Sequence, residues 1–344
     1  MSVIVKGVDL GGTKAVMASV DVIEEKIVGE VVRIETDKLK SNEDFICWLK
    51  DNNKEGYPYG ICVPGIRMDE TRYLCENTLW KNVDVKSLNA VIMNDMTGAK
   101  KSLEKRMKEK GVNIWSLWTI STGMNGATTF NGIDISHELG HQVYSVPENI
   151  EVPVGFKLTK CNCLYGKIGD MGHLEVALSA SGAERMARDY YLNSSEVDTL
   201  FMKGFKTLGD LSEIFMHDPG TRKEAIKKIH AGMIYDSYKE MPYQFPQKYI
   251  VKIQRDSLAT AIGNYMSTFP FCEEIVFMGS QGINNFEDQV LPAVKICREN
   301  GMCHPGIKMP RVSKIDVEFP GIIGSAIDYA KQKGYKQKIL LISE

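Results

Sequence analysis

The sequence predicts an α/β protein built from two similar halves, and three observations lead to that prediction. Apolar strand-like segments alternate with amphipathic helical segments along most of its 344 residues. A polar turn with glycines joins two strand-like segments near residue 10, and a second such turn follows residue 120. The later part of the chain thus repeats the opening pattern, so we expect a second α/β domain to start near residue 115.

The expected elements follow one another closely. An amphipathic helix is expected at 43–53, and another at 98–111 with a solvated basic face, which Gly111 ends. Residues 183–268 have a mostly helical pattern, and a closing helix is expected at 321–334. Strands are expected at 2–10, 15–22, 26–36, 56–65, 87–95, 112–123, 125–132 and 274–280.

Composition and charge exclude several classes of partner. A net charge of −2 with scattered lysines gives no basic stripe that could follow a phosphate backbone, so we expect no nucleic-acid partner. No stretch approaches the 18 or so apolar residues of a membrane helix, and the first residues lack the apolar core of a signal peptide. We therefore expect a cytoplasmic protein without a membrane partner, in which most of the eight cysteines are buried thiols.

The first polar turn, DLGGTK at residues 9–14, has the character of an anion site. It leads from a strand into another strand, which excludes the P-loop and the dinucleotide-binding turn, because both lead into a helix. Its glycines let backbone N–H groups approach an anion closely, and Asp9 stands at the strand end beside a possible cation. The turn STGMNG at residues 121–126 has the same setting. Two such turns, one at the start of each half, are expected to bind a phosphate chain from both sides.

Ten short blocks now point to a family. They are GVDLGGTKAVMASVD, GICVPG, NTLW, MNDMTGAKKSL, STGMNGATTFNG, ELGH, CNC, GHLE, VFMGSQG and GIIGSA. In this order the chain resembles the ROK-family sugar kinases of the actin-like, sugar kinase and Hsp70 ATPase superfamily, from residue 3 to about 330. The resemblance implies two actin-like (RNase H-like) lobes with a ligand cleft between them. We expect the N-terminal lobe at 1–115 with 322–344, and the C-terminal lobe at 116–321.

The resemblance also implies ATP and Mg²⁺ as cofactors, and it assigns their contacts. Ser280 and Gln281 stand where the family usually has more glycines, in the loop that lies against adenosine. The implied nucleotide-binding residues are Asp9, Gly11, Gly12, Thr13, Lys14, Thr122, Gly123, Gly279 and Gly282.

A sugar hydroxyl needs an acceptor for its proton when it attacks phosphorus, because its own pKa lies far above 7. Asp95 matches the family's catalytic base, and Asn94 precedes it as a sugar contact. Without the family, this pair is explained as the start of a helix capped by Asn94, and the two roles are compatible. The implied substrate-binding residues are Asn94, Asp95, Glu138, His141 and Glu175.

The stretch ISHELGHQ at residues 135–142 also fits the zinc-protease motif H-E-x-x-H. Tyr144 and Pro147 occupy the positions where a metzincin has its glycine and third histidine, so the protease remains a distant alternative. The ROK resemblance instead implies a structural zinc. Its third cysteine is replaced here by His173, and a Cys₂His₂ set of His141, Cys161, Cys163 and His173 is chemically sound. The alternative is that the metal is lost and the thiols are only buried.

The expected function is an ATP-dependent sugar kinase that phosphorylates the 6-hydroxyl of a hexose or N-acetylhexosamine, with glucose and N-acetylmannosamine as leading candidates. Some family members are repressors with a DNA-binding segment before the first phosphate turn, for which the residues before Asp9 leave no room. A non-catalytic sugar-binding regulatory protein is the remaining alternative. The resemblance implies a homodimer or higher homo-oligomer.

Overall fold

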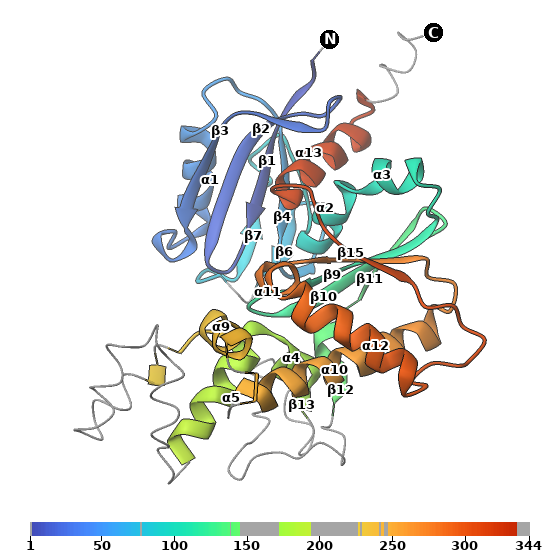
Figure 1. Ribbon diagram of the computed structural model, residues 1–344. Coiled ribbons are helices and arrows are strands. Elements are labelled where there is room, and N and C mark those ends of the chain that lie inside the picture. Colours follow the sequence, from blue (N-terminus) through green and yellow to red (C-terminus); the bar gives the residue numbers. More distant parts are fainter. Residues whose placement is uncertain are drawn as a thin grey trace. The chain divides into compact units, whose positions relative to one another are not determined.

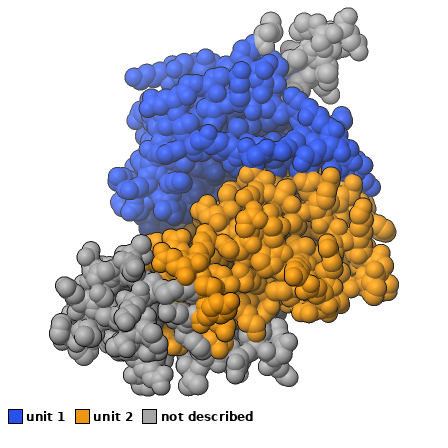
Figure 2. Space-filling model, viewed as in Figure 1, with its two compact units in different colours: residues 1–113, 131–136, 316–344 blue, residues 114–130, 137–315 orange. Residues whose placement is uncertain are grey.

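The computed structural model describes residues 2–75, 78–137, 139–144, 172–193, 226–227, 229–240, 242–243 and 247–335. The chain divides into two compact units, which Figure 2 colours separately. Unit 1 comprises residues 1–113, 131–136 and 316–344, and unit 2 comprises 114–130 and 137–315. The domain bounds expected from the sequence remain a prediction. None of the described helices has the length and apolar character needed to cross a membrane.

Unit 1 is built on a five-stranded sheet with the order β3-β2-β1-β4-β8. The first three strands form an antiparallel meander, and β1, β4 and β8 run parallel. Hydrophobic runs buried on both faces explain the central strands, because both sides of the sheet are covered. The strands are β1 (Ile4–Leu10), β2 (Lys14–Asp21), β3 (Lys26–Glu35), β4 (Tyr59–Val63) and β8 (Ala90–Asn94).

Helices cover the two faces of this sheet (Figure 1). Helix α1 (Asn42–Asp51) begins at a Ser41 capping box and contributes Phe45, Trp48 and Leu49 to one core. Helix α13 (Pro320–Gln332) contributes to the core on the other face and packs on β1, β4 and α2. The remaining elements are the 3₁₀ turn Thr36–Lys38, α2 (Asp95–Lys101), α3 (Glu104–Glu109) and a small sheet of β5 (Ile66–Arg67), β6 (Arg72–Leu74) and β7 (Asn82–Asp84).

The single helix expected at 98–111 is wrong in two respects. It starts earlier, at Asp95, and it is interrupted between α2 and α3. The interruption lies at Ser102, whose hydroxyl donates to the carbonyl of Ala99 at 2.7 Å. A serine that bonds to nearby backbone competes with the helical hydrogen bonds, which accounts for the break.

A second five-stranded sheet has most of its strands in unit 2, and its order β11-β10-β9-β14-β15 repeats that of the first. Residues 133–136 of its edge strand β11 belong to unit 1. Here β9 pairs antiparallel with β10 and parallel with β14, and β14 pairs parallel with β15. The expected second α/β half is therefore present, with its hairpin at the predicted place. The strands are β9 (Ile114–Ile120), β10 (Met124–Phe130), β11 (Ile133–His137), β14 (Glu274–Met278) and β15 (Arg311–Lys314).

Helix α10 (Gln247–Thr268) is the centre of the unit 2 core and packs on α4, α5, α9 and α12. Two short strands, β12 (Val143–Tyr144) and β13 (Gly172–His173), pair beside the 3₁₀ turn Leu139–His141. The other helices are α4 (Leu174–Leu178), α5 (Ala180–Asn193), α9 (Ala231–Glu240), α11 (Ser280–Asn284), the π-helical turn Phe286–Val290 and α12 (Leu291–Glu299).

Glycines set the distance between α13 and the first sheet. A Cβ atom on Gly60 of β4 would lie 2.0 Å from the carbonyl oxygen of Ser325 in α13, and one on Gly7 of β1 would lie 2.0 Å from that of Ile322. We expect Gly60→Ala to lower the free energy of unfolding by about 3 kcal/mol, because a backbone clash in a packed core forces the helix away. Urea unfolding followed by circular dichroism measures this change.

Gly232→Ala is the matched control. Its added Cβ would meet only the His230 ring, at 3.2 Å, and alanine suits a helix better than glycine, so stability should be unchanged or slightly higher. Equal unfolding midpoints for Gly60→Ala and the parent protein would show that α13 does not pack on β4 as described.

Candidate active site

The first polar turn joins β1 to β2 and is braced from the side. The Gly11 N–H donates to the Lys14 carbonyl at 2.9 Å, which closes the turn. Thr36 holds both ends of it, since its hydroxyl donates to the Gly11 carbonyl at 2.7 Å and its N–H donates to the Thr13 carbonyl at 2.9 Å. Gly12, Thr13 and Lys14 are exposed. The turn is therefore fixed through its carbonyls and presents its outer residues to solvent.

Asp9 lies near the end of β1 on the face that α13 covers. One carboxylate oxygen is 3.6 Å from Cys62 Sγ, and the other is 2.6 Å from where a Cβ on Gly321 would lie. Gly321 is in the first turn of α13, so the carboxylate lies at a helix N-terminus, which favours negative charge. Burial raises the pKa of Asp9, and the Cys62 contact and the charge of Lys14 only partly offset that rise. An enclosed carboxylate of this kind is stabilised by a cation beside it.

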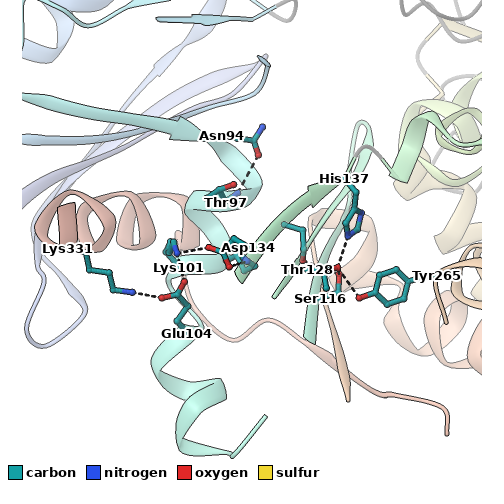
Figure 3. Close-up of polar contacts among 12 residues, drawn as sticks. Asn94, Thr97, Lys101, Glu104, Ser116, Thr128, Asp134, His137, Tyr265 and Lys331 are labelled. Atoms are coloured by element: carbon teal, nitrogen blue, oxygen red, sulfur yellow. Dashed lines mark hydrogen bonds and ion pairs between the residues drawn. The ribbon is translucent and has the colours of Figure 1, made fainter. Parts of the chain in front are cut away.

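Asn94 and Asp95 stand where β8 ends and α2 begins. Figure 3 shows Asn94 beside Thr97 of that helix. Asn94 Oδ1 accepts from the N–H groups of Met96 at 3.0 Å and Thr97 at 3.4 Å, so the capping role is confirmed. Its Nδ2 donates to the Gly65 carbonyl at 3.3 Å. Asp95 Oδ1 also accepts from the Met96 N–H, at 2.9 Å. The carboxylate therefore occupies the first helical position, where the helix dipole favours its charge.

The far end of α2 is fixed by ion pairs. Asp134 pairs with two lysines. Lys100 is fully buried, and the Lys101 ammonium lies 2.6 Å from the Asp134 carboxylate. Lys101 also pairs with Glu104 at 2.6 Å, and Glu104 with Lys331 of α13, as Figure 3 shows. Burial lowers the pKa of Lys100, and the Asp134 carboxylate opposes that change. Because a buried ammonium is stable only beside its partner, these contacts hold α2 in one position.

In unit 1, Asp9 and Asp95 lie on two sides of one thiol. Cys62 is in β4, between β1 and β8, and is fully buried. Burial and the charges of both aspartates raise its pKa well above the usual value. The carboxyl edge of the parallel strands thus gathers Asp9, the glycine turn and the Asn94-Asp95 pair, which is where open α/β sheets keep their ligands.

The second polar turn joins β9 to β10 in unit 2 and is held by the junction between α4 and α5. The Ser121 N–H donates to the Gly123 carbonyl at 2.8 Å. The Ala180 N–H donates to the Ser121 carbonyl at 2.7 Å, and Ser181 Oγ donates to the Thr122 carbonyl at 2.6 Å. As in the first turn, the carbonyls are the groups that the surrounding chain fixes.

Glu175 of α4 contacts this second turn directly. Its Oε2 accepts from the Met124 N–H at 3.2 Å and lies 2.8 Å from where a Cβ on Gly123 would be. Gly140 approaches from the other side, since a Cβ there would lie 2.3 Å from the Met124 carbonyl oxygen. Residues from three separate segments therefore meet at Met124, and the approach of Gly140 to the backbone requires glycine.

The two histidines of the predicted zinc site meet in unit 2. His141 Nδ1 and His173 Nδ1 are 3.3 Å apart, with the rings edge to face. Burial, and then the nearby His141, lower the pKa of His173. No group of three or more metal-binding side chains occurs among the described residues. Cys161, Cys163 and Glu138 lie outside those residues.

The protease alternative is contradicted. His137 ends strand β11, and His141 ends a 3₁₀ turn, so the two do not share the face of an α-helix as a zinc protease requires. His137 Nε2 instead lies 2.7 Å from the Thr128 hydroxyl, which is also 2.9 Å from the Tyr265 hydroxyl (Figure 3). Its ring stacks on Phe269. His137 is thus part of the unit 2 core.

The loop expected to contact adenosine follows β14. Gly279 has a positive φ of 83°, and a Cβ there would lie 2.5 Å from the Ile120 carbonyl oxygen, so the loop packs on the end of β9. Gly282 lies in α11 near the same residue. Gln281 points into the core, where its Nε2 donates to Gln254 Oε1 at 2.9 Å. That contact explains how a longer side chain is accommodated in a loop that was expected to hold glycine.

Sequence reasoning missed several residues of this arrangement. Three residues each hold a loop that the sequence motifs identify, although they belong to no motif themselves: Thr36, Ser181 and Gln254. They contact the chain 25, 59 and 75 residues away, and a single sequence carries no signal for such pairs. Cys62 was within a recognised block, but its place between two aspartates became visible only once the strand order was known.

No protein-family model matches this chain, and no curated protein matches it. Solved structures do. A ROK-family glucokinase from Streptomyces griseus, in complex with glucose and AMPPNP, matches with a TM-score of 0.63 and 18% identity, over 96% of this chain and 99% of that one. A glucokinase from Balamuthia mandrillaris, in complex with glucose, matches with a TM-score of 0.67 and 16% identity, over 96% and 94%.

A ROK-family transcriptional regulator, a homolog of the E. coli MLC protein, is similar to the same degree. Its TM-score is 0.67 at 13% identity, over 99% of this chain and 81% of that one. At these identities the comparisons establish the fold. The predicted fold class is confirmed, and the chain has the actin-like α/β fold of ROK-family sugar kinases and regulators.

Proposed function

We propose that this protein is an ATP-dependent sugar kinase that transfers the γ-phosphoryl group to the 6-hydroxyl of a hexose or N-acetylhexosamine. Glucose and N-acetylmannosamine are the leading candidates. The observation that carries the proposal is the position of Asp95, whose carboxylate starts a helix at the carboxyl edge of the sheet, with Asp9 on the other side of Cys62. Two carboxylates at this edge suit a base for the hydroxyl and a partner for a cation.

Asp95 is proposed as the general base. The helix N-terminus and the Met96 N–H favour its ionised form, which can accept the proton that the sugar hydroxyl loses on attack. Its position is fixed from both ends of α2, by the Asn94 cap and by the buried ion pair of Lys100 with Asp134. A fixed base matters because proton transfer requires hydrogen-bonding distance to the attacking oxygen. Glu138, His141, Glu175 and Asn94 are proposed as sugar contacts.

The nucleotide contacts are proposed at both polar turns and at the loop after β14. Phosphate oxygens would be bound by backbone N–H groups of Gly12 and Thr13, in the turn that the Gly11 N–H closes, with Lys14 as a cation, and by those of Thr122 and Gly123 in the second turn. Gly279 and Gly282 are proposed to lie against adenosine. Mg²⁺, when bound with ATP, neutralises charge on the phosphoryl oxygens, and the Asp9 carboxylate offers the oxygen ligand that this ion prefers.

A non-catalytic sugar-binding regulator is the second candidate, because a ROK transcriptional regulator has the same fold. The kinase and the regulator differ in whether bound sugar is phosphorylated. A coupled assay of ADP formation with glucose, N-acetylmannosamine, N-acetylglucosamine and mannose separates them: sugar-dependent ADP formation supports the kinase, whereas sugar binding without turnover supports the regulator.

We expect Asp95→Asn to lower kcat by about 10³- to 10⁴-fold while sugar still binds, because the amide keeps the shape of the side chain but cannot accept the proton. Asp9→Asn should raise the KM for Mg²⁺-ATP more than it weakens sugar binding, since Asp9 is assigned to the cation. Steady-state kinetics and direct sugar titration of both variants make the comparison. If Asp95→Asn turned over at nearly the parental rate, Asp95 would not be the general base, and its role would be limited to starting helix α2.

We also propose a structural zinc bound by His141, His173, Cys161 and Cys163. Two nitrogens bound to one tetrahedral zinc at about 2.0–2.1 Å lie about 3.3–3.4 Å apart. The His141 and His173 Nδ1 atoms are separated by 3.3 Å, so the pair fits one edge of that tetrahedron without rearrangement. Zinc there would fix the start of α4, which carries Glu175.

Protein purified without chelator should contain about one zinc per chain, and a chelator should lower its Tm. His173→Ala should lose the metal because a closed site needs all four ligands. His304→Ala is the control, since that histidine is exposed and, among the described residues, its side chain accepts from the Gly306 N–H. Metal analysis and thermal melting give the answer. Less than half an equivalent of zinc in the parent protein would mean that the two histidines contact each other without a metal.

A further inference from the structure

The side chain of Gln254, in the middle of α10, uses its full hydrogen-bonding capacity inside the unit 2 core. It is fully buried. Its Nε2 donates to the carbonyls of Leu178 at 3.3 Å and Ser179 at 3.2 Å. Its Oε1 accepts from Gln281 Nε2 at 2.9 Å and from the Tyr235 hydroxyl. A glutamine has two donor hydrogens and two acceptor lone pairs, and all four are used here.

The orientation of this amide is set by chemistry. Leu178 and Ser179 present carbonyl oxygens, which only accept, so the nitrogen of Gln254 must face them. Its oxygen then faces α11, and Gln281 must turn its own nitrogen toward that oxygen. The two amides therefore specify one arrangement of three segments: the end of α4, the middle of α10 and the loop after β14.

The contacts continue from Ser179 to the second polar turn. Ser179 Oγ caps α5 through the Gly182 N–H at 3.0 Å and lies 3.1 Å from Ser181 Oγ. Ser181 and Ala180 in turn hold the carbonyls of Thr122 and Ser121. A continuous set of hydrogen bonds thus connects the loop after β14 with the turn between β9 and β10.

We infer that Gln254 is a positioning residue that holds the adenosine loop and the second phosphate turn at a fixed separation, so that one nucleotide fits both. The inference rests on the proposed kinase function, because it takes these two loops as nucleotide contacts. Gln254 itself lies in the core and touches no ligand. Its effect is therefore on nucleotide affinity, through the placement of Gln281 and of the α4–α5 junction.

The two glutamines can be tested separately. Gln254→Met removes all four hydrogen bonds and should weaken AMPPNP binding about tenfold, the usual scale for a residue that couples two parts of a site. Gln281→Met removes the two hydrogen bonds by which α11 is linked to this cluster, from Gln281 Nε2 to Gln254 Oε1 and to the Tyr235 hydroxyl at 3.2 Å. Gln254 Oε1 would keep the bond from the Tyr235 hydroxyl, and Gln281 Oε1, which has no partner among the described residues, would be removed from the core. Gln281→Met should therefore weaken AMPPNP binding similarly, with little change in Tm.

Tyr235→Phe is the matched control. It deletes a hydroxyl that donates to Gln254 Oε1 and accepts from Gln281 Nε2 at 3.2 Å, but it leaves the direct bonds of Gln254 with Gln281, Leu178 and Ser179. It should lower Tm while the dissociation constant for AMPPNP stays within about twofold. If Gln254 contributed to stability alone, AMPPNP affinity would instead fall in step with Tm across the three variants.

The measurements are calorimetric titration of the full-length chain with AMPPNP and Mg²⁺, thermal melting, and KM for the panel sugar with the highest kcat/KM. Weaker nucleotide binding in both glutamine variants, with an unchanged KM for sugar, is the expected result. Parental nucleotide affinity in Gln281→Met, or an equal loss of sugar and nucleotide affinity, would overturn the role of Gln254. A parent chain that binds no nucleotide would instead overturn the kinase proposal on which that role depends.

Discussion

Helix α13 lies against β1, β4 and α2 so closely that its neighbours have no room for a side chain. A Cβ on Gly324 would be 1.7 Å from the Gly98 carbonyl oxygen, and Gly7 and Gly60 face equally close carbonyls. This backbone contact places the first turn of α13 beside Asp9 and holds α2 at the edge of the sheet. The positions of Asp9 and Asp95 therefore depend on Gly7, Gly60 and Gly324, since a larger residue at any of the three would push the helix outward.

Both polar turns are fixed through their carbonyl oxygens. Thr36 holds the first turn and the α4–α5 junction holds the second, in each case by donors from outside the turn. Gly11 and Ser121 close the two turns with their own N–H groups, and the donors from outside reach carbonyl oxygens, which an anion does not bind. In the second turn the Met124 N–H is already bonded to the Glu175 carboxylate, which brings a residue assigned to the sugar into contact with a loop assigned to phosphate.

Much of this organisation could be predicted because it depends on local chemistry. Glycines between two strands predict a hairpin, and Asn94-Asp95 after a strand predicts a capped helix; both were found. The break at Ser102 was missed because a serine in a helical pattern does not reveal which carbonyl it bonds. Long-range partners could not be predicted at all. Gln254 looks like an ordinary polar residue of an amphipathic helix, and only the folded chain brings it to Ser179.

The charges around Cys62 bear on which acceptor the edge of the first sheet would take. Asp9 and Asp95 both act on this buried thiol, and by raising its pKa they keep it neutral, so it adds no third negative charge. Lys14 offsets part of the charge of Asp9, while Asp95 has the dipole of α2 behind it. Two carboxylates in this setting attract a cation and hydroxyl donors, and they repel a further carboxylate. For the proposed kinase, these charges argue for an uncharged sugar rather than a sugar acid as the acceptor.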